Sequence, residues 1–259
     1  MTRKRLVAGR GRCYGALVLG YDSFTAWAAA TAIVMTGAAL QGSAGFGFAL
    51  LSSPILAWVD AKLVPGPIIV AVTLLLVLTA WRERSAVDAR GLGWILAGRV
   101  PGTVLGALAL QTLGDRALLI GLGVLVLLAV GLSLGSVRLA RTRPLLVVAG
   151  VVSGLMGTTA ALGGPAVAVL YQHERGPLVR STLASYFLIG AFMSMTALAL
   201  VGRLGTREVT LAAGLLPGIA AGFWASRWTS RWLDGGHTRT AVLLVAALAG
   251  LGSVLHGVL

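Results

Sequence analysis

Charged residues are scarce in this 259-residue chain, and acidic residues are scarcer than basic ones. Charged side chains make up 11% of the sequence and hydrophobic ones 57%, whereas soluble domains carry about 25% and roughly 45–50%. This composition excludes an ordinary water-soluble protein. The apolar residues come in runs of about twenty, the length that crosses a hydrocarbon core. We therefore predict an all-α integral membrane protein.

Side chains that commonly bind metals or relay protons, namely cysteine and the acidic residues, are also rare. The single cysteine, Cys13, excludes an intramolecular disulfide and a thiolate metal cluster. The eight acidic residues all fall in connections or at the ends of apolar runs, so no carboxylate relay crosses the bilayer centre. We expect no metal and no cofactor.

The net charge of +13 would suggest a nucleic-acid partner in a soluble protein. Here the basic residues lie singly or in small groups between apolar runs, so we expect them to mark the cytoplasmic side and expect no nucleic acid. The positive-inside rule groups the basic tail with the loops 82–90, 138–143 and 203–207. It predicts a multi-pass protein of the cell inner membrane or plasma membrane with both termini cytoplasmic.

The chain contains eight apolar segments, four in each half. They lie at about 24–59, 64–81, 92–112, 117–136, 144–170, 180–202, 208–228 and 240–258. The first is too long for one crossing and the fifth too short for two, so each should hold one crossing plus a broken or re-entrant piece. The predicted organisation is a basic extension at 1–23, a transmembrane repeat at 24–137, a linker loop at 138–143 and a second repeat at 144–259.

Glycine-rich interruptions occur at matching places in the two halves, and we predict that they bind substrate. Their residues are Gln41, Gly42, Ser43, Gly45 and Gly47 in the first break, and Gly157, Thr158, Thr159, Gly163, Gly164 and Pro165 in the second. Open N–H groups at a helix start, together with hydroxyls, favour an anion. Non-helical backbone at membrane depth must face protein or a watery cavity, so both breaks should face inward. The alternative is that the glycines only allow close helix packing.

A Pro-Gly-x-x-x-Gly motif follows each break at almost the same distance. Its residues, which we predict to pack helices, are Pro101, Gly102 and Gly106 in the first half and Pro217, Gly218 and Gly222 in the second. Internal duplication with broken apolar segments is typical of transporters whose substrate site lies between the repeats. Four segments per half imply parallel repeats, whereas a re-entrant piece that fully crossed would make them inverted.

This order of breaks and motifs resembles the sulfite exporter TauE/SafE family of permeases over residues 24–259. The first break departs from the more usual Gly-Gly-Gly-Pro run, because it carries Gly45-Phe46-Gly47 and a later Pro54. The resemblance implies duplicated four-helix halves and transport of small anions, with sulfite and organosulfonates as the best-known class.

Arg99 lies inside the apolar run 92–112, where an ionisable side chain is a candidate functional residue. Its guanidinium could offer a bidentate fork to an oxyanion. It could instead reach the membrane interface, and its counterpart in the second repeat is Leu215. Hydroxyls on the segment 180–202 either bond between helices, which explains most such groups, or line a pore; they are those of Ser185, Tyr186, Ser194 and Thr196.

We therefore predict a secondary transporter, not an enzyme, that moves a small anion by alternating access between two repeats. Sulfite or an organosulfonate is the expected substrate, and the protein is expected to lie in the lipid bilayer. The sequence leaves open whether copies of the chain form a homo-oligomer. One alternative is a non-transporting membrane scaffold or assembly factor. Another is an intramembrane hydrolase that uses Ser43 with His256, but a serine nucleophile needs a base within hydrogen-bond reach.

Overall fold

The structure is a computed structural model that describes residues 24–44, 47–84, 86–134, 140–171, 174, 176–233 and 237–258. The predicted extension 1–23 and Gly45 lie outside these residues. Within them the chain is all-helical, as predicted, with ten α-helices, one short 3-10 helix and no strand. The elements are α1 (Phe24–Ala44), α2 (Phe48–Val59), η1 (Ala61–Leu63), α3 (Gly66–Arg82), α4 (Ala89–Thr112), α5 (Asp115–Leu134), α6 (Arg143–Ala160), α7 (Gly164–Tyr171), α8 (Gly176–Leu200), α9 (Thr206–Leu233) and α10 (His237–Val258).

The eight apolar segments become ten helices because the first and fifth each divide at a glycine-rich break. Before α2, Gly47 has a φ of 113°, which a residue with a side chain rarely adopts. Ala161 ends α6 in the left-handed conformation, and the N–H of Leu162 bonds back to the carbonyl of Met156 at 3.1 Å. In the described residues, six helices are long and apolar enough to cross a membrane, namely α1, α4, α5, α6, α8 and α9. Shorter apolar helices are α2, α3 and part of α10.

The two halves run in opposite directions, so the repeats are inverted. Where α1 and α3 both end, Arg82 donates to the Gly42 carbonyl, and Glu83 pairs with Arg180 at the start of α8. At the opposite end, α2 leads through η1 into α3, and Gly66 lies beside Glu208 of α9. Thus α1 and α2 form a hairpin that returns to its starting end, as α6 and α7 do from the other end. After its hairpin, each half crosses the membrane with three further helices, so the second half starts from the opposite end of the bundle. This corrects the parallel arrangement implied by four segments per half.

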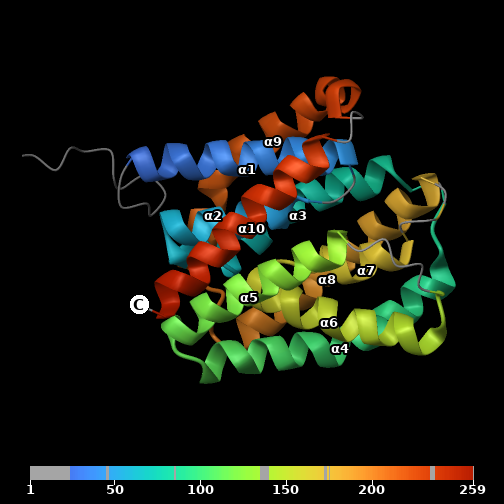
Figure 1. The fold of residues 1–259 in the computed structure, drawn as a ribbon, viewed down its shortest axis with the longest axis horizontal. Helices are drawn as coiled ribbons and strands as arrows, with labels where there is room; N and C mark the ends of the chain where they lie inside the picture. Colours follow the sequence, from blue (N-terminus) through green and yellow to red (C-terminus); the bar gives the residue numbers. More distant parts are fainter. Residues whose placement is uncertain are drawn as a thin grey trace, which may run out of the picture.

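Each broken helix packs against a helix of the other half. Figure 1 shows α1 beside α9 along one edge of the bundle and α4 beside α6 along the opposite edge. The helices α3 and α8, and likewise α5 and α10, also pair across the halves. Buried apolar side chains fill the space between these pairs, including Leu75, Leu198 and Val126. Both halves therefore contribute to the buried apolar clusters.

The Pro-Gly-x-x-x-Gly motifs lie where these helices touch. A Cβ on Gly102 of α4 would collide with the carbonyl oxygen of Val151 on α6, and one on Gly222 of α9 with that of Met35 on α1. Gly106 faces Leu155 and Gly218 faces Thr31 in the same way. Pro101 and Pro217 lie on the exposed sides of α4 and α9. The glycines permit backbone-to-backbone approach, which drives helix association in lipid.

Basic side chains lie at both ends of the bundle. The ion-paired end, where α3 ends and α8 begins, carries Arg82, Arg84, Arg90, Arg141, Arg143, Arg180 and Arg227. The terminal end, where α1 starts and α10 ends (left in Figure 1), carries Lys62, Arg116, Arg203 and Arg207. The loops 82–90 and 203–207 are therefore on opposite sides. Our sequence-based grouping of them was wrong because the hairpin adds no net crossing.

Candidate functional site

Both breaks line one central cavity of about 70 Å³. The first break contributes Gln41 and Gly47, followed by the first residues of α2, and the second contributes Gly157 and residues 161–165. The remaining lining residues are Ile69, Val72 and Leu76 of α3, Arg99 of α4, and Phe187, Ala191 and Ser194 of α8. The cavity is thus formed by elements of both halves and lies between the paired helices α3 and α8.

Two helix starts face this cavity. Gly47, Phe48, Ala49 and Leu50 begin α2, and Gly163 to Pro165 begin α7. The first N–H groups of a helix have no carbonyl partner within that helix, and the helix dipole adds a partial positive charge there. The two starts therefore make the cavity attractive to an anion.

Arg99 reaches into the protein interior rather than to the membrane interface. Its side chain comes from α4, the residue is 4% exposed, and it lines the central cavity. One terminal nitrogen donates to the Tyr186 hydroxyl at 2.7 Å and the Ser153 hydroxyl at 3.3 Å. The other donates to the Gly190 carbonyl at 3.1 Å and lies 3.4 Å from the Ser194 hydroxyl. Its Nε is buried and has no hydrogen-bond partner.

Three glycines make room for this guanidinium. A Cβ on Gly190 would collide with the guanidinium carbon of Arg99. A Cβ on Gly157 would lie 2.9 Å from one terminal nitrogen, and one on Gly163 would lie 3.1 Å from the other. The Tyr186 ring covers the guanidinium, with 4.9 Å between its centroid and the guanidinium carbon. Side chains at these glycines would therefore displace the charge.

No carboxylate balances Arg99 within the described part of the chain. Ion pairs join Arg82 and Arg180 to Glu83, and Arg141 to Asp88 and Glu174. All of them lie at the ion-paired end of the bundle. In contrast, the groups that contact Arg99 in the central cavity are neutral hydroxyls, a carbonyl and an aromatic ring. A buried cation held only by neutral dipoles is electrostatically unbalanced.

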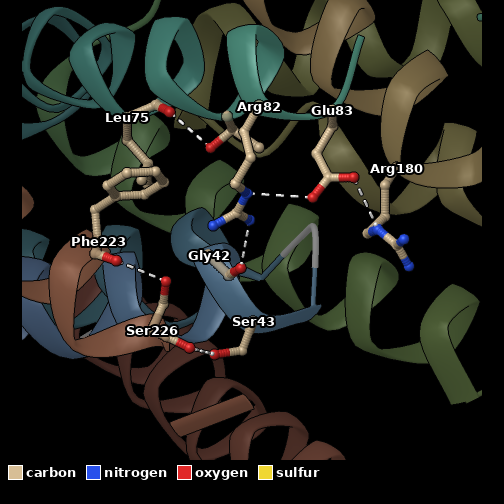
Figure 2. Close-up of polar contacts among 9 residues, drawn as sticks. Gly42, Ser43, Leu75, Arg82, Glu83, Arg180, Phe223 and Ser226 are labelled. Atoms are coloured by element: carbon tan, nitrogen blue, oxygen red, sulfur yellow. Dashed lines mark hydrogen bonds and ion pairs between the residues drawn. The ribbon is translucent and has the colours of Figure 1, made fainter. Parts of the chain in front are cut away.

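Two predicted residues of the first break contact α3 and α9 instead of lining the cavity. Figure 2 shows Arg82 between the Gly42 carbonyl, 2.7 Å away, and Glu83, 3.2 Å away. The Ser43 hydroxyl lies 2.9 Å from the Ala39 carbonyl, and Figure 2 shows its contact with the Ser226 carbonyl, which is 3.3 Å away. Gly42 and Ser43 thus hold the end of α1 against α3 and α9 at the ion-paired end.

The predicted residues of the second break lie closer to Arg99. Gly157, Gly163, Gly164 and Pro165 line the cavity. The Thr158 hydroxyl lies 3.0 Å from that of Ser194, whereas Thr159 donates back to the Leu155 carbonyl within its own helix. Sequence reasoning gave no role to Ser153, Gly190, Phe48 or Phe187. Small and apolar residues inside a span carry no signal that separates a site from ordinary packing.

The hydrolase alternative gains no support from these contacts. The Ser43 hydroxyl is directed at backbone carbonyls of α1 and α9. The side chain of His256 lies outside the described part of the structure. The groups of three or more His, Cys, Asp or Glu residues that could hold a metal ion are absent from the described residues.

A family model described as sulfite exporter TauE/SafE matches residues 29–253, which include both breaks, Arg99 and both Pro-Gly-x-x-x-Gly motifs. No curated protein and no solved structure gives a significant match.

Proposed function

We propose that this chain, which belongs to the sulfite exporter TauE/SafE family, carries a small sulfur-containing anion through the central cavity. It is a multi-pass membrane protein, and members of this family are transporters rather than enzymes. The proposed substrate site consists of the starts of α2 and α7 together with Arg99.

The unbalanced charge of Arg99 carries this proposal. An ionised side chain in a membrane interior is expensive unless it is paired, and a guanidinium cannot escape the penalty by losing its proton. An anion in the cavity would supply the missing negative charge and could accept from the unpartnered Nε. Arg99 would then act as a substrate ligand rather than a structural residue.

The volume of the cavity supports a small substrate. A cavity needs roughly 10–15 Å³ in this measure to hold one water molecule. The 70 Å³ observed therefore admits only a few non-hydrogen atoms. Sulfite or a short organosulfonate agrees with this size and with the family.

Alternating access is the mechanism that the inverted repeats favour. In transporters of this architecture, one repeat rocks against the other around a site near the midplane. The ion pair of Glu83 with Arg180 connects the end of α3 with the start of α8 at the ion-paired end of the bundle, and Arg82 at the end of α3 pairs with the same Glu83. We infer that these contacts hold that end closed in the conformation described here, and that opening it requires α3 and α8 to separate.

Among the described residues, more basic side chains lie at the ion-paired end than at the terminal end, which favours the ion-paired end as the cytoplasmic one. The start of α1 and the end of α10 share the terminal end, so both would face away from the cytoplasm in the inner or plasma membrane. This proposal reverses our sequence-based orientation.

Labelling of single cysteines in a Cys13→Ser background tests the orientation. An impermeant thiol reagent added to intact cells should label the Lys62→Cys variant and spare the Arg84→Cys variant. Labelling of Arg84→Cys but not of Lys62→Cys would contradict the proposed orientation.

Flux measurements on the purified full-length protein in liposomes test the function. We expect labelled sulfite to move in the wild type and in Arg207→Gln, which removes an exposed arginine at the terminal end. Arg99→Gln should abolish flux. Arg99→Lys should retain little flux, because lysine lacks the planar guanidinium that binds an oxyanion through two hydrogen bonds. Absence of flux of any tested anion through folded wild type would favour the membrane-scaffold alternative, and full flux through Arg99→Gln would remove Arg99 from the site.

A further inference from the structure

The cavity has charge of one sign and walls that are mostly apolar. Arg99 is the one charged side chain among the described residues that line it, and both helix starts add positive potential. The other lining side chains are apolar except for the neutral Gln41 and Ser194. Positive potential without an acidic acceptor limits which groups a substrate can carry into this space.

We infer that the site selects anions that carry no cationic group and that tolerate an apolar wall, and that it rejects zwitterionic aminosulfonates. This inference rests on the proposed function and specifies its substrate class. Simple alkanesulfonates and sulfite belong to the accepted class. An aminosulfonate such as taurine differs from ethanesulfonate only by an ammonium group, so the two form a matched pair.

The first argument concerns the ammonium group. In a cavity of about 70 Å³, a short aminosulfonate bound through its sulfonate would keep its ammonium inside the same space as Arg99. Like charges at close range in a low-dielectric site repel strongly. The acidic residues of the ion pairs, Glu83, Asp88 and Glu174, lie at the bundle end and not among the cavity-lining residues. The ammonium would therefore lose its hydration without gaining a counter-charge.

The second argument concerns the apolar wall. Phe48 begins α2, Phe187 lies on α8, and Ile69, Val72 and Leu76 form the face of α3 that lines the cavity. A methyl or methylene group can replace water against such a surface favourably, whereas a charged or strongly hydrated group cannot. The cavity thus combines an anion-binding side with a side suited to a short alkyl group.

Competition with labelled sulfite in liposomes tests the inference. We expect ethanesulfonate to inhibit sulfite flux at a concentration at least about tenfold lower than taurine, because an unpaired buried polar or charged group loses that much or more. Equal inhibition by the two, or stronger inhibition by taurine, would overturn the selectivity. No inhibition by ethanesulfonate would overturn the role of the apolar wall. Either result with sulfite flux still dependent on Arg99 leaves the proposed function intact, whereas lack of all sulfite flux contradicts the function itself.

A nearly isosteric variant gives a second, independent measurement. Gln41→Glu adds a carboxylate to the cavity wall, 5% exposed in the wild type, with little change in shape. It should shift the ratio of ethanesulfonate to taurine inhibition toward taurine by about tenfold, because an ammonium then finds a counter-charge. Glu208→Gln, at the terminal end, serves as a charge-changing control outside the cavity and should leave the ratio unchanged. An unchanged ratio in folded Gln41→Glu would contradict the electrostatic basis of the selectivity.

Discussion

The hydroxyl of Tyr186 accepts a hydrogen bond from Arg99 at 2.7 Å, while the ring of the same tyrosine covers the guanidinium. The hydroxyl also lies 2.6 Å from that of Ser153. One residue of α8 therefore fixes both the plane and the direction of a charge that originates on α4. Because α4 and α8 belong to different halves, the placement of the charge depends on how the halves meet.

Tyr186→Phe should separate the two contributions of this side chain. The variant keeps the ring over Arg99 and removes the hydroxyl, and hydrogen bonds to charged groups contribute about 1.5–3 kcal/mol. We expect weaker substrate binding, seen as a KM for sulfite flux raised about tenfold or more. Tyr186→Ala should lose the ring as well and reduce flux further. A KM unchanged in Tyr186→Phe would show that the hydroxyl does not position the guanidinium.

Gly190→Ala should displace the guanidinium by adding a single methyl group. That Cβ would collide with the Arg99 side chain, and Arg99 is held on its other sides by Ser153 and Tyr186. We expect a large loss of flux with the protein still folded. Gly131→Ala on α5 is the matched control, because nothing lies within 4 Å of its Cβ. Equal flux in the two variants would mean that Arg99 can move without consequence.

Gly102→Ala should weaken the contact between α4 and α6. The added Cβ meets backbone, which cannot rotate away as a flexible side chain could. Overpacking of this kind destabilises proteins by about 1–3 kcal/mol, so the midpoint of thermal unfolding in detergent should fall. Gly121→Ala, whose Cβ meets nothing within 4 Å, should leave the midpoint unchanged or raise it. A midpoint for Gly102→Ala that matches this control would contradict the close contact.

Glu83→Gln should make the ion-paired end open more often. Glu83 is 18% exposed and pairs with two arginines that are 37% and 43% exposed, so solvent weakens each pair. We expect a cysteine at Ala49, on the cavity wall, to react a few times faster with a thiol reagent applied from that end. Glu208→Gln, at the terminal end, should not accelerate this reaction. A slower reaction in Glu83→Gln would indicate that Glu83 holds this end open.

The sequence predicted the helical fold and the two breaks because both depend on local signals. Apolar runs define helices in a membrane, and Gly47 and the glycines of 157–164 interrupt them. The direction of the halves was not predictable, since it depends on whether the short helices α2 and α7 return to the end they came from. Their lengths of 12 and 8 residues are compatible with either outcome until tertiary packing is known.

The surroundings of Arg99 were predicted only in part. An arginine in an apolar run indicates a functional residue, but whether it turns inward depends on contacts from distant helices. Gly190 and Ser153 are separated from it by 91 and 54 positions. Ser43 was expected beside the substrate because hydroxyls near glycines suggest binding. Its actual partners are the Ala39 carbonyl of its own helix and the Ser226 carbonyl, and the second contact depends on the packing of α9 against α1.

The exchange of partners between the halves, with α1 on α9 and α6 on α4, has a consequence for assembly. Glycines on those helices allow close contact with a helix that only the opposite half supplies. A fragment ending after α5 would therefore expose the contact faces of α1 and α4 to lipid. Two genes encoding the fragments separately should yield stable product only when expressed together. Fusing them into one polypeptide guarantees equal supply of each fragment, which offers a physical reason for a tandem gene rather than a dimer of identical short chains.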